Sequence, residues 1–470
     1  MKRPARKLLL LLVLCGTVLC LLFHFTQRIK GVNIDRDDSS YPSVNDIVPV
    51  KRTVIYGGYV VNTAMHGQQV SYVKILMAQQ CFFGAVGNIS IVEPFFYNNH
   101  FYGEPQKKPL DTQMRFRNFF NVHKHNEIAK QQHFAQLVSW EDFLSNAPRE
   151  VVYVDLKSRG LECDIDRFIY LLQKSHCSDE KMRFLQQNNF TVVKTIYTYT
   201  TYENLMKGGT SWPIDKVTLV FRLAEPGFFR EHSDIYNNPC VDVFYSNPHI
   251  QLISSQRILH QVDLYESHFL HGENRLAVVI RLEHILEGIG RQEKGRQQRY
   301  HAIETCLNVT AKMSILLSTN SRSFVATDYS NYTSISWRET KSVYHYTDEQ
   351  MIHIFGLGRR VVEDILQGGW EFDKWASSFS EVTEGIDDPG YVAALQRTIA
   401  SRAKCLVLVG GGDFQYLILQ QYMHNLPHES QLCVHLVCIP SFLHDKLQLL
   451  LRAFQLRCVW KSTFCTLQYS

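Results

Sequence analysis

The chain has 470 residues, of which 45% are hydrophobic and 12% aromatic. This length and apolar content exclude an intrinsically disordered chain and predict two or three domains with buried cores. The 49 lysine and arginine residues nearly balance the 45 aspartate and glutamate residues. A net charge of +4 is too small for the field that nucleic-acid binding requires, so we expect no nucleic-acid partner.

The N-terminus has the features of a membrane-insertion signal. Four basic residues between positions 2 and 7 precede an apolar run at positions 8–25. This run is slightly shorter than the about 20 residues of a typical spanning helix and longer than a signal-peptide core of about 7 to 15. No convincing cleavage site follows it, so we favour an uncleaved signal-anchor over a cleaved signal peptide.

The orientation of this transmembrane helix follows from its flanking charges. The positive-inside rule places positions 1–7 in the cytosol and everything after the helix in the lumen. We therefore predict a single-pass type II protein of the Golgi or endoplasmic reticulum membrane, followed by a polar stem at positions 26–51.

Glycosylation sequons agree with a lumenal body. Four asparagines are followed two residues later by serine or threonine, with no proline between, and are predicted N-glycosylation sites: Asn88, Asn189, Asn308 and Asn331.

Cysteine usage also agrees with an oxidising compartment. Of the twelve cysteines, Cys15 and Cys20 lie in the apolar run, which leaves ten, an even number that suits disulfide bonds. Spacing does not fix the connectivity. The most local possible pairs are Cys163 with Cys177 and Cys458 with Cys465. For Cys433 and Cys438, in an apolar strand-like run, buried thiols or a disulfide are favoured over metal ligation.

The body alternates between strand-like and helix-like segments. The first set has strands predicted at 52–61, 90–96, 150–156 and 217–223, with helices at 71–80 and 166–174. The second set has strands at 275–281, 323–327, 404–409 and 432–438, with helices at 300–317, 389–403 and 414–423. Strand–helix–strand units at this spacing indicate parallel sheets.

Two such sets predict an α/β protein with two Rossmann-like domains that face a cleft. We place the boundary between positions 245 and 270, and divide the body into domains at 52–255 and 256–470. The glycine-containing segment at 356–360 is expected to be a loop that opens a helix at 359–366.

Three strand ends of the second domain carry residues suited to a nucleotide diphosphate. Arg281 ends an apolar strand, and a guanidinium there can bind a diphosphate with two hydrogen bonds. Asp328 follows a second strand, where it could accept hydrogen bonds from a ribose or base. Three glycines at 410–412 join a third strand to a helix, so that backbone amides could approach a phosphate.

Each of these features also has a purely structural interpretation. Arg281 could pair with Glu283, Asp328 could cap the next turn, and the glycines could serve a tight turn. Asp413, directly after the glycines, could cap the helix in place of an anion. The three strand ends together are more specific than any one of them.

In this order, the segments VIRLEH, FVATD and LVGGGDFQ resemble the three conserved regions of the GDP-fucose-dependent fucosyltransferase superfamily. The first region of that family is H-x-R, and here Val279 stands in place of the histidine while Arg281 matches the arginine. The resemblance implies that Arg281 holds the diphosphate and that Asp328 helps to hold the nucleoside. It places the phosphate turn and its aromatic residue at four positions: Gly411, Gly412, Asp413 and Phe414.

The resemblance further implies the GT-B fold, with an acceptor-side first domain and a second domain that binds the nucleotide sugar. The expected donor is GDP-fucose, the acceptor a hydroxyl group of a protein or glycan, and no metal cofactor is required. A loop containing His66 resembles the first loop of the family, and His66 and Glu283 are the candidate general bases.

Two other hypotheses compete with this one. A metal-dependent transferase would use a D-x-D motif, and Asp164 and Asp166 form one, but Asp166 is better explained as the N-cap of a helix. The second alternative is a catalytically inactive binding or scaffold protein on the same fold, which Val279 and Asp413 favour.

Overall fold

The computed structural model describes a large part of the chain after position 57. The described residues are 58–62, 69–86, 89–96, 114–156, 186–198, 218–223, 240, 243–273, 276–282, 284–286, 296–318, 323–327, 346–366, 377–378, 381–382, 388–426, 432–440, 443–461 and 464–469. All of them belong to one compact unit, Pro49–Ser470. Within this part, no helix has both the length and the apolar character to span a bilayer. The predicted anchor at 8–25 and the stem lie outside the described residues.

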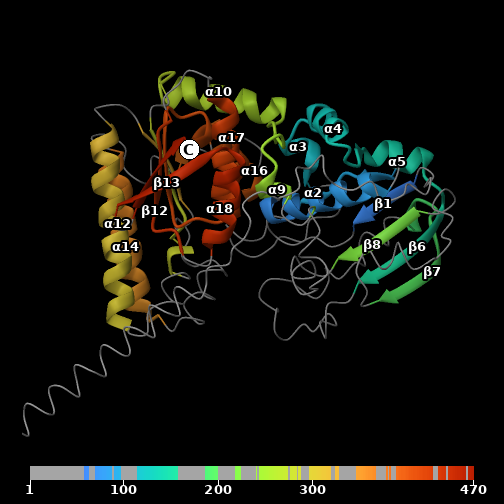
Figure 1. Cartoon of the computed structure of the whole chain (residues 1–470), viewed down its shortest axis with the longest axis horizontal. Helices are drawn as coiled ribbons and strands as arrows, with labels where there is room; N and C mark the ends of the chain where they lie inside the picture. Colours follow the sequence, from blue (N-terminus) through green and yellow to red (C-terminus); the bar gives the residue numbers. More distant parts are fainter. Residues whose placement is uncertain are drawn as a thin grey trace, which may run out of the picture. The chain divides into compact units, whose positions relative to one another are not determined.

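The first sheet is entirely parallel. Its strands, in spatial order, are β5 (Leu137–Val138), β2 (Ile89–Val92), β1 (Gly58–Asn62), β8 (Thr218–Leu223), β6 (Glu150–Leu156) and β7 (Thr191–Thr198). Strands β8, β6 and β7 lie side by side in Figure 1. The helices of this region are α2 (Gln69–Val86), α3 (Phe116–Phe119), α4 (Val122–Gln131) and α5 (Trp140–Asn146). Helix α2 connects two parallel neighbours, β1 and β2, as the strand–helix–strand pattern predicted.

The second sheet is mixed. Four parallel strands, β10 (Ser323–Thr327), β9 (Leu276–Ile280), β11 (Cys405–Val409) and β12 (Val434–Val437), are followed by the antiparallel strands β14 (Phe464–Tyr469) and β13 (Leu456–Lys461). Every residue of β9, β10 and β11 is buried. This explains the unbroken apolar sequences of β9 and β11, because a parallel strand covered on both faces has no polar side. In β10 the apolar centre lies between two buried polar residues, Ser323 and Thr327.

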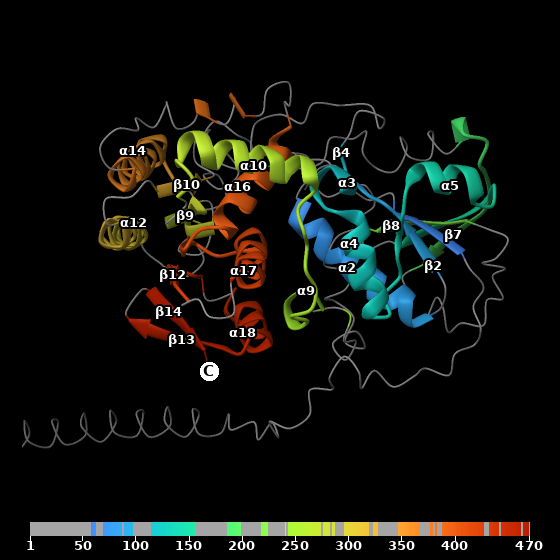
Figure 2. The same ribbon diagram turned by 90° about the horizontal axis from the view of Figure 1, so that it is seen from above.

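Helices cover both faces of the second sheet. Helices α12 (Arg296–Ser318) and α14 (Asp348–Ile365) lie on one side, and α16 (Pro389–Ser401) and α17 (Asp413–Asn425) lie on the other (Figure 2). Helix α18 (His444–Ala453) packs beside β13. The segment between the sheets contains α9 (Val243–Ser246), which contacts α2 and α18, and α10 (Gln256–Phe269), which contacts α16.

The predicted mixed α/β architecture with two successive strand–helix sets is thus confirmed in the described residues, and two of the strands, β6 and β10, have the predicted bounds. The predicted strand at 90–96 is split, because Pro94 has no amide to continue the ladder and Phe95–Phe96 (β3) instead pairs antiparallel with Met114–Arg115 (β4). The predicted helix at 166–174, with the D-x-D motif, lies outside the described residues.

The prediction of a loop at 356–360 was wrong, because these residues lie inside α14. That helix begins earlier, at a capping box in which Thr347 and Gln350 exchange hydrogen bonds. Its buried stripe includes Met351, Ile354 and Gly358. A glycine inside a helix costs only about 1 kcal/mol, which the cap and the buried stripe offset.

Disulfide bonds, predicted from the cysteine count, are present and join distant parts of the chain. The described bridges are Cys81–Cys240, Cys306–Cys438 and Cys405–Cys433, with sequence separations of 159, 132 and 28. Cys458 is also disulfide-bonded. Cys163 and Cys177, one of the two most local possible pairs, and the side chain of Cys465 lie outside the described residues. Disulfides between cysteines that are far apart in the sequence stabilise the fold, because they restrict the conformations of the unfolded chain.

A buried histidine fixes the packing of α4 against α2. The Nε2 atom of His125 lies 2.9 Å from Oε1 of Gln80, whose amide nitrogen in turn donates to the carbonyl of Ala135 at 2.8 Å. The residue is 7% exposed, and its ring lies tilted against that of Phe116, with 5.0 Å between the centroids. Burial lowers the pKa of His125 to about 4, because the charged form would lose its hydration.

This lowered pKa makes the stability of the protein depend on pH. Between pH 6.5 and about 4 the unfolded chain binds a proton at His125 and the folded chain does not, so stability is full above pH 6.5 and falls as the pH drops through this window. At pH 4 the free energy of unfolding is expected to be lower by on the order of 3 kcal/mol than above pH 6.5. We expect His125→Gln, which keeps a hydrogen-bond donor for Gln80, to lose this pH dependence of the free energy of unfolding. Urea unfolding curves at pH 7 and pH 5 measure the change. The exposed His123→Gln on the same helix should behave as wild type, and equal pH slopes in both variants would contradict the assignment.

Candidate functional site

Three strand ends meet at one edge of the second sheet, in register. Ile280, the last residue of β9, is paired with Thr327 of β10 on one side and Val409 of β11 on the other. Arg281 and Gly410 therefore follow at the same level. The amide of Arg281 donates to the carbonyl of Val409 at 2.9 Å. Asp328, the next residue after β10, lies outside the described residues.

The turn between β11 and α17 consists of three glycines in the left-handed region. Their φ angles are 95° at Gly410, 70° at Gly411 and 110° at Gly412, which other residues adopt only with strain. No backbone carbonyl in the described part of the chain accepts a hydrogen bond from the amide of Gly411 or Gly412. These donors lie just before the N-terminus of a helix of 13 residues, where a negative charge is favoured.

Close packing supplies a second reason for glycine. A Cβ atom on Gly410 would lie 2.5 Å from the carbonyl oxygen of Arg281, and one on Gly412 would lie 3.0 Å from Nε2 of His284. The turn therefore brings β9 and β11 close together, and it presents amides at a helix start.

Arg281 reaches the first turn of α17. Its guanidinium lies 5.8 Å from the ring centroid of Phe414, and the residue is 3% exposed. Gln415 connects the same turn to the sheet: its side-chain amide donates to the carbonyls of Val279 at 2.9 Å and Val409 at 2.8 Å. Arg281 and the glycine turn thus lie together at the start of α17.

Asp413 is the centre of a charged cluster that the sequence analysis did not predict. We call Lys74, Tyr245, Asp413 and Lys446 the Asp413 cluster. The Nζ atom of Lys74 donates to Oδ2 of Asp413 at 2.7 Å, and Nζ of Lys446 lies 3.9 Å from Oδ1. The hydroxyl of Tyr245 donates to Oδ1 of the same carboxylate. The side chains of Lys74 and Asp413 are 13% and 17% exposed.

The Asp413 carboxylate is ionised under all ordinary conditions. Burial by itself raises the pKa of Asp413, but the charges of Lys74 and Lys446 and the hydrogen bonds from Lys74 and Tyr245 outweigh burial and hold this pKa far below its usual range. So weak a base cannot accept the proton of an acceptor hydroxyl at neutral pH. Asp413 is therefore a poor candidate for the general base.

The remaining predicted site residues are placed as follows. The two candidate bases, His66 and Glu283, lie outside the described residues, as do Asn88 and Asn331. Asn189 and Asn308 are exposed, as a glycosylated asparagine must be. Residues that the sequence analysis missed at the site are Lys74, Tyr245, Lys446 and His284.

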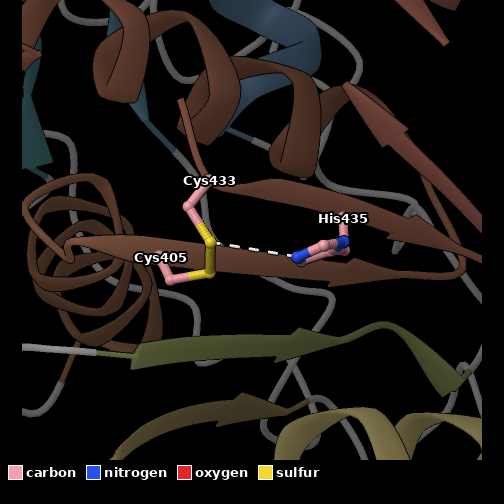
Figure 3. Close-up of side chains that lie close together, drawn as sticks. All are labelled: Cys405, Cys433 and His435. Carbon is pink, nitrogen blue, oxygen red and sulfur yellow. Dashed lines mark hydrogen bonds between the residues drawn. A yellow bond between two sulfur atoms is a disulfide. The ribbon is translucent and has the colours of Figure 1, made fainter. Parts of the chain in front are cut away.

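Among the described residues, one group has the atoms of a metal site: Cys405, Cys433 and His435, whose ligand atoms lie within 4.8 Å of one another. The two sulfur atoms form a disulfide, and Nε2 of His435 lies 3.8 Å from the sulfur of Cys433 (Figure 3). Disulfide sulfurs are not thiolates, so this oxidised group does not offer the ligands of a zinc site.

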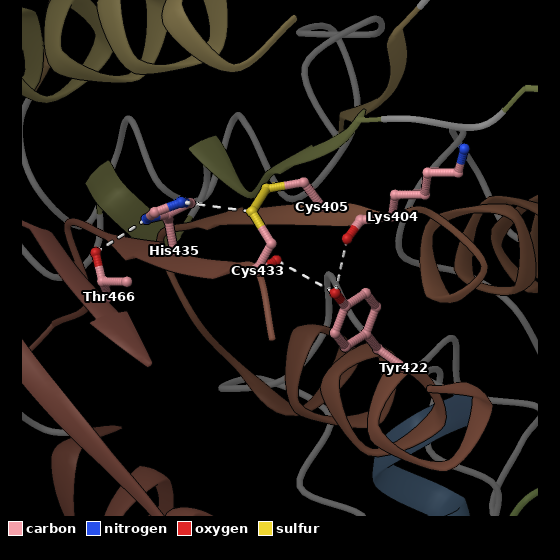
Figure 4. The surroundings of a disulfide bond; sticks show 6 residues. All are labelled: Lys404, Cys405, Tyr422, Cys433, His435 and Thr466. Carbon is pink, nitrogen blue, oxygen red and sulfur yellow. Dashed lines mark hydrogen bonds between the residues drawn. A yellow bond between two sulfur atoms is a disulfide. The ribbon is translucent and has the colours of Figure 1, made fainter. Parts of the chain in front are cut away.

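The hydrogen bonds around this disulfide indicate a structural role. The Nδ1 atom of His435 lies 3.1 Å from the hydroxyl of Thr466, and Tyr422 donates to the carbonyl of Lys404 at 3.0 Å (Figure 4). The bridge joins the residue that begins β11 to the residue just before β12. It therefore lies at the opposite ends of these strands from the glycine turn.

No protein-family model matches the chain, and no curated protein matches it. Solved structures of POFUT1 are similar to it. The complex with GDP-fucose is 14% identical, covers 80% of this chain and 98% of that chain, and has a TM-score of 0.43. The complex with GDP is 14% identical, covers 81% and 99%, and has a TM-score of 0.43. The apo form is 13% identical, covers 77% and 94%, and has a TM-score of 0.40.

We expect Gly410→Ala to destabilise the protein by about 3 kcal/mol, since the new Cβ both clashes with the Arg281 carbonyl and strains the backbone. Gly356→Ala is the matched control: it lies inside α14, and its Cβ would meet no atom within 4 Å. Loss of helix-interior glycine should stabilise the protein by about 0.5 to 1 kcal/mol. Urea unfolding at pH 7 measures both changes, and similar effects of the two variants would contradict this account of the turn.

Proposed function

We propose that the protein is a glycosyltransferase of the secretory-pathway lumen that transfers fucose from GDP-fucose to a hydroxyl group of a protein or glycan acceptor. One observation carries the proposal: the Arg281 guanidinium and the glycine turn meet at the first turn of α17. A guanidinium and backbone amides at a helix start together suit a diphosphate leaving group.

The donor class comes from the order of residues at the strand ends, VIRLEH, FVATD and LVGGGDFQ, which resembles that of GDP-fucose-dependent enzymes. GDP-fucose is therefore the first donor to test, and it is also the ligand in one of the POFUT1 crystals. The nucleoside would be held with the help of Asp328. No metal is needed where cations and amides of the protein neutralise the diphosphate.

The reaction breaks the bond between C1 of fucose and the diphosphate oxygen, and forms a bond between C1 and the acceptor oxygen. The leaving GDP takes the electron pair of the broken bond, while a base takes the proton of the hydroxyl. Arg281 and the amides of the turn stabilise the charge that develops on the diphosphate. His66 and Glu283 remain the proposed candidates for the base.

The second candidate is a catalytically inactive binding protein on the same fold. Its support is specific: Val279 stands where the family has histidine, and the Asp413 carboxylate takes part in ion pairs at the place where a diphosphate would be bound. The two candidates differ in turnover, so release of fucose or transfer to an acceptor decides between them.

We expect Arg281→Ala to weaken GDP binding on the order of 100-fold, because a buried diphosphate contact would lose its guanidinium. Isothermal titration of the full-length protein with GDP measures this change. Arg281→Lys keeps the charge but not the paired hydrogen bonds, and should have an intermediate affinity.

Arg402→Ala is the control, since Arg402 forms ion pairs with Asp263 and Glu266 and is not at the strand-end edge. Thermal unfolding shows whether each variant remains folded. Unchanged GDP affinity in folded Arg281→Ala would refute the donor site.

The proposed location is the lumen of the endoplasmic reticulum or Golgi, with the apolar run at 8–25 as anchor. The disulfides of the described residues support an oxidising compartment. We expect a C-terminal epitope to be protected from protease in intact microsomes, and Asn189→Gln to remove one glycan in a mobility assay with endoglycosidase. Asn146→Gln, an exposed asparagine outside any sequon, should change nothing. A protease-sensitive epitope would rule out this orientation.

A further inference from the structure

The Asp413 carboxylate lies within ion-pair distance of two lysines. The Nζ atom of Lys74 is in contact with it at 2.7 Å, whereas Nζ of Lys446 lies at 3.9 Å, the limit of an ion pair. The side chains of Lys74, Asp413 and Lys446 are 13%, 17% and 22% exposed, so water screens these ion pairs little.

The ring of Tyr245 lies near both lysines as well. The distances from its centroid to Nζ of Lys74 and of Lys446 are 5.7 Å and 5.6 Å. Cation–π attraction at these distances holds ammonium groups independently of the carboxylate. Tyr245 therefore lies near both ammonium groups and helps to position them beside Asp413.

The cluster adjoins the proposed donor site. Asp413 follows the glycine turn directly and precedes Phe414, over whose ring the Arg281 guanidinium lies. The lysines come from elements far apart in the chain: Lys74 from α2 and Lys446 from α18. The first turn of α17 therefore has a guanidinium and two ammonium groups in its neighbourhood, and both ammonium groups lie near the Asp413 carboxylate.

We propose that the Asp413 carboxylate is an internal competitor for the donor: it occupies Lys74 and Lys446, which pass to the diphosphate when the donor binds. This inference rests on the proposed function and deepens it. A diphosphate carries more negative charge than a carboxylate and neutralises both lysines. Asp413 thereby sets a threshold for the charge of the anion that can bind. An anion with a single charge gains too little electrostatic free energy from the lysines to displace the carboxylate.

The central test is Asp413→Asn, which removes the charge and keeps the shape and an acceptor for the Tyr245 hydroxyl. Titration calorimetry with inorganic pyrophosphate and with GDP, at low and moderate salt, measures the outcome. We expect pyrophosphate and GDP to bind Asp413→Asn at least about tenfold more tightly than wild type, with the larger gain in affinity at low salt. Unchanged or weaker pyrophosphate binding would overturn the proposal.

Asp445→Asn is the matched control, because Asp445 is exposed, precedes Lys446 directly and loses the same charge. It should leave pyrophosphate affinity nearly unchanged, and a gain equal to that of Asp413→Asn would mean that net charge alone is responsible. Lys446→Met should weaken pyrophosphate binding in the wild-type and Asp413→Asn backgrounds. If Asp413→Asn does not fold, Lys446→Met in the wild type decides: unchanged affinity overturns the proposal.

The two proposals can fail separately. If Asp413→Asn gains pyrophosphate binding but no variant binds GDP, the competitor role stands and the nucleotide donor does not. If wild type binds GDP in a manner that depends on Arg281, and Asp413→Asn binds pyrophosphate and GDP no more tightly, the donor site stands and the competitor role is refuted.

Discussion

The contact between Gly410 and the carbonyl of Arg281 is the constraint on which the rest of the site depends. Because no side chain intervenes, β9 and β11 can end at the same level, and the amide of Arg281 can donate to the carbonyl of Val409. Gln415 then bonds to carbonyls of both strands and fixes the start of α17 above them. The position of the guanidinium beside Phe414 follows from this backbone arrangement.

The first turn of α17 is also where elements from the two halves of the sequence meet. Asp413 binds Lys74, 339 residues earlier in the chain, and Tyr245, 168 residues earlier. A buried charge without partners would be costly, so these contacts require α2, α9 and α17 to pack together. The carboxylate that joins these elements also lies beside the proposed diphosphate site. The lysines that hold the helices together are therefore the same lysines that are proposed to bind the ligand.

Local patterns were sufficient to predict the strand ends but not this cluster. Buried parallel strands such as β9 and β11 have unbroken apolar sequences, and the residue after each run marks the sheet edge, which is why Arg281 and the glycines could be identified. Lys74 lies on a helix whose pattern indicates only burial, and Tyr245 and Lys446 belong to short helices. Their convergence depends on tertiary packing between distant segments, and no local spacing encodes it. The start of the helix through Gly356 was placed too late for a related reason. The cap at Thr347 and the buried stripe of this helix outweigh the helix-breaking tendency of the glycines, from which a loop was predicted.

The low pKa of Asp413 determines what can release the two lysines. A carboxylate whose pKa lies far below its usual range stays ionised at neutral and mildly acidic pH, so acidification does not free the lysines. A change in packing of α2 or α18 could free them, and so could an anion that offers more negative charge. Of these, only the anion brings new negative charge to the lysines in place of the carboxylate. A diphosphate is therefore the natural competitor for Asp413, and the residue that weakens the case for catalysis also defines which ligand the site would accept.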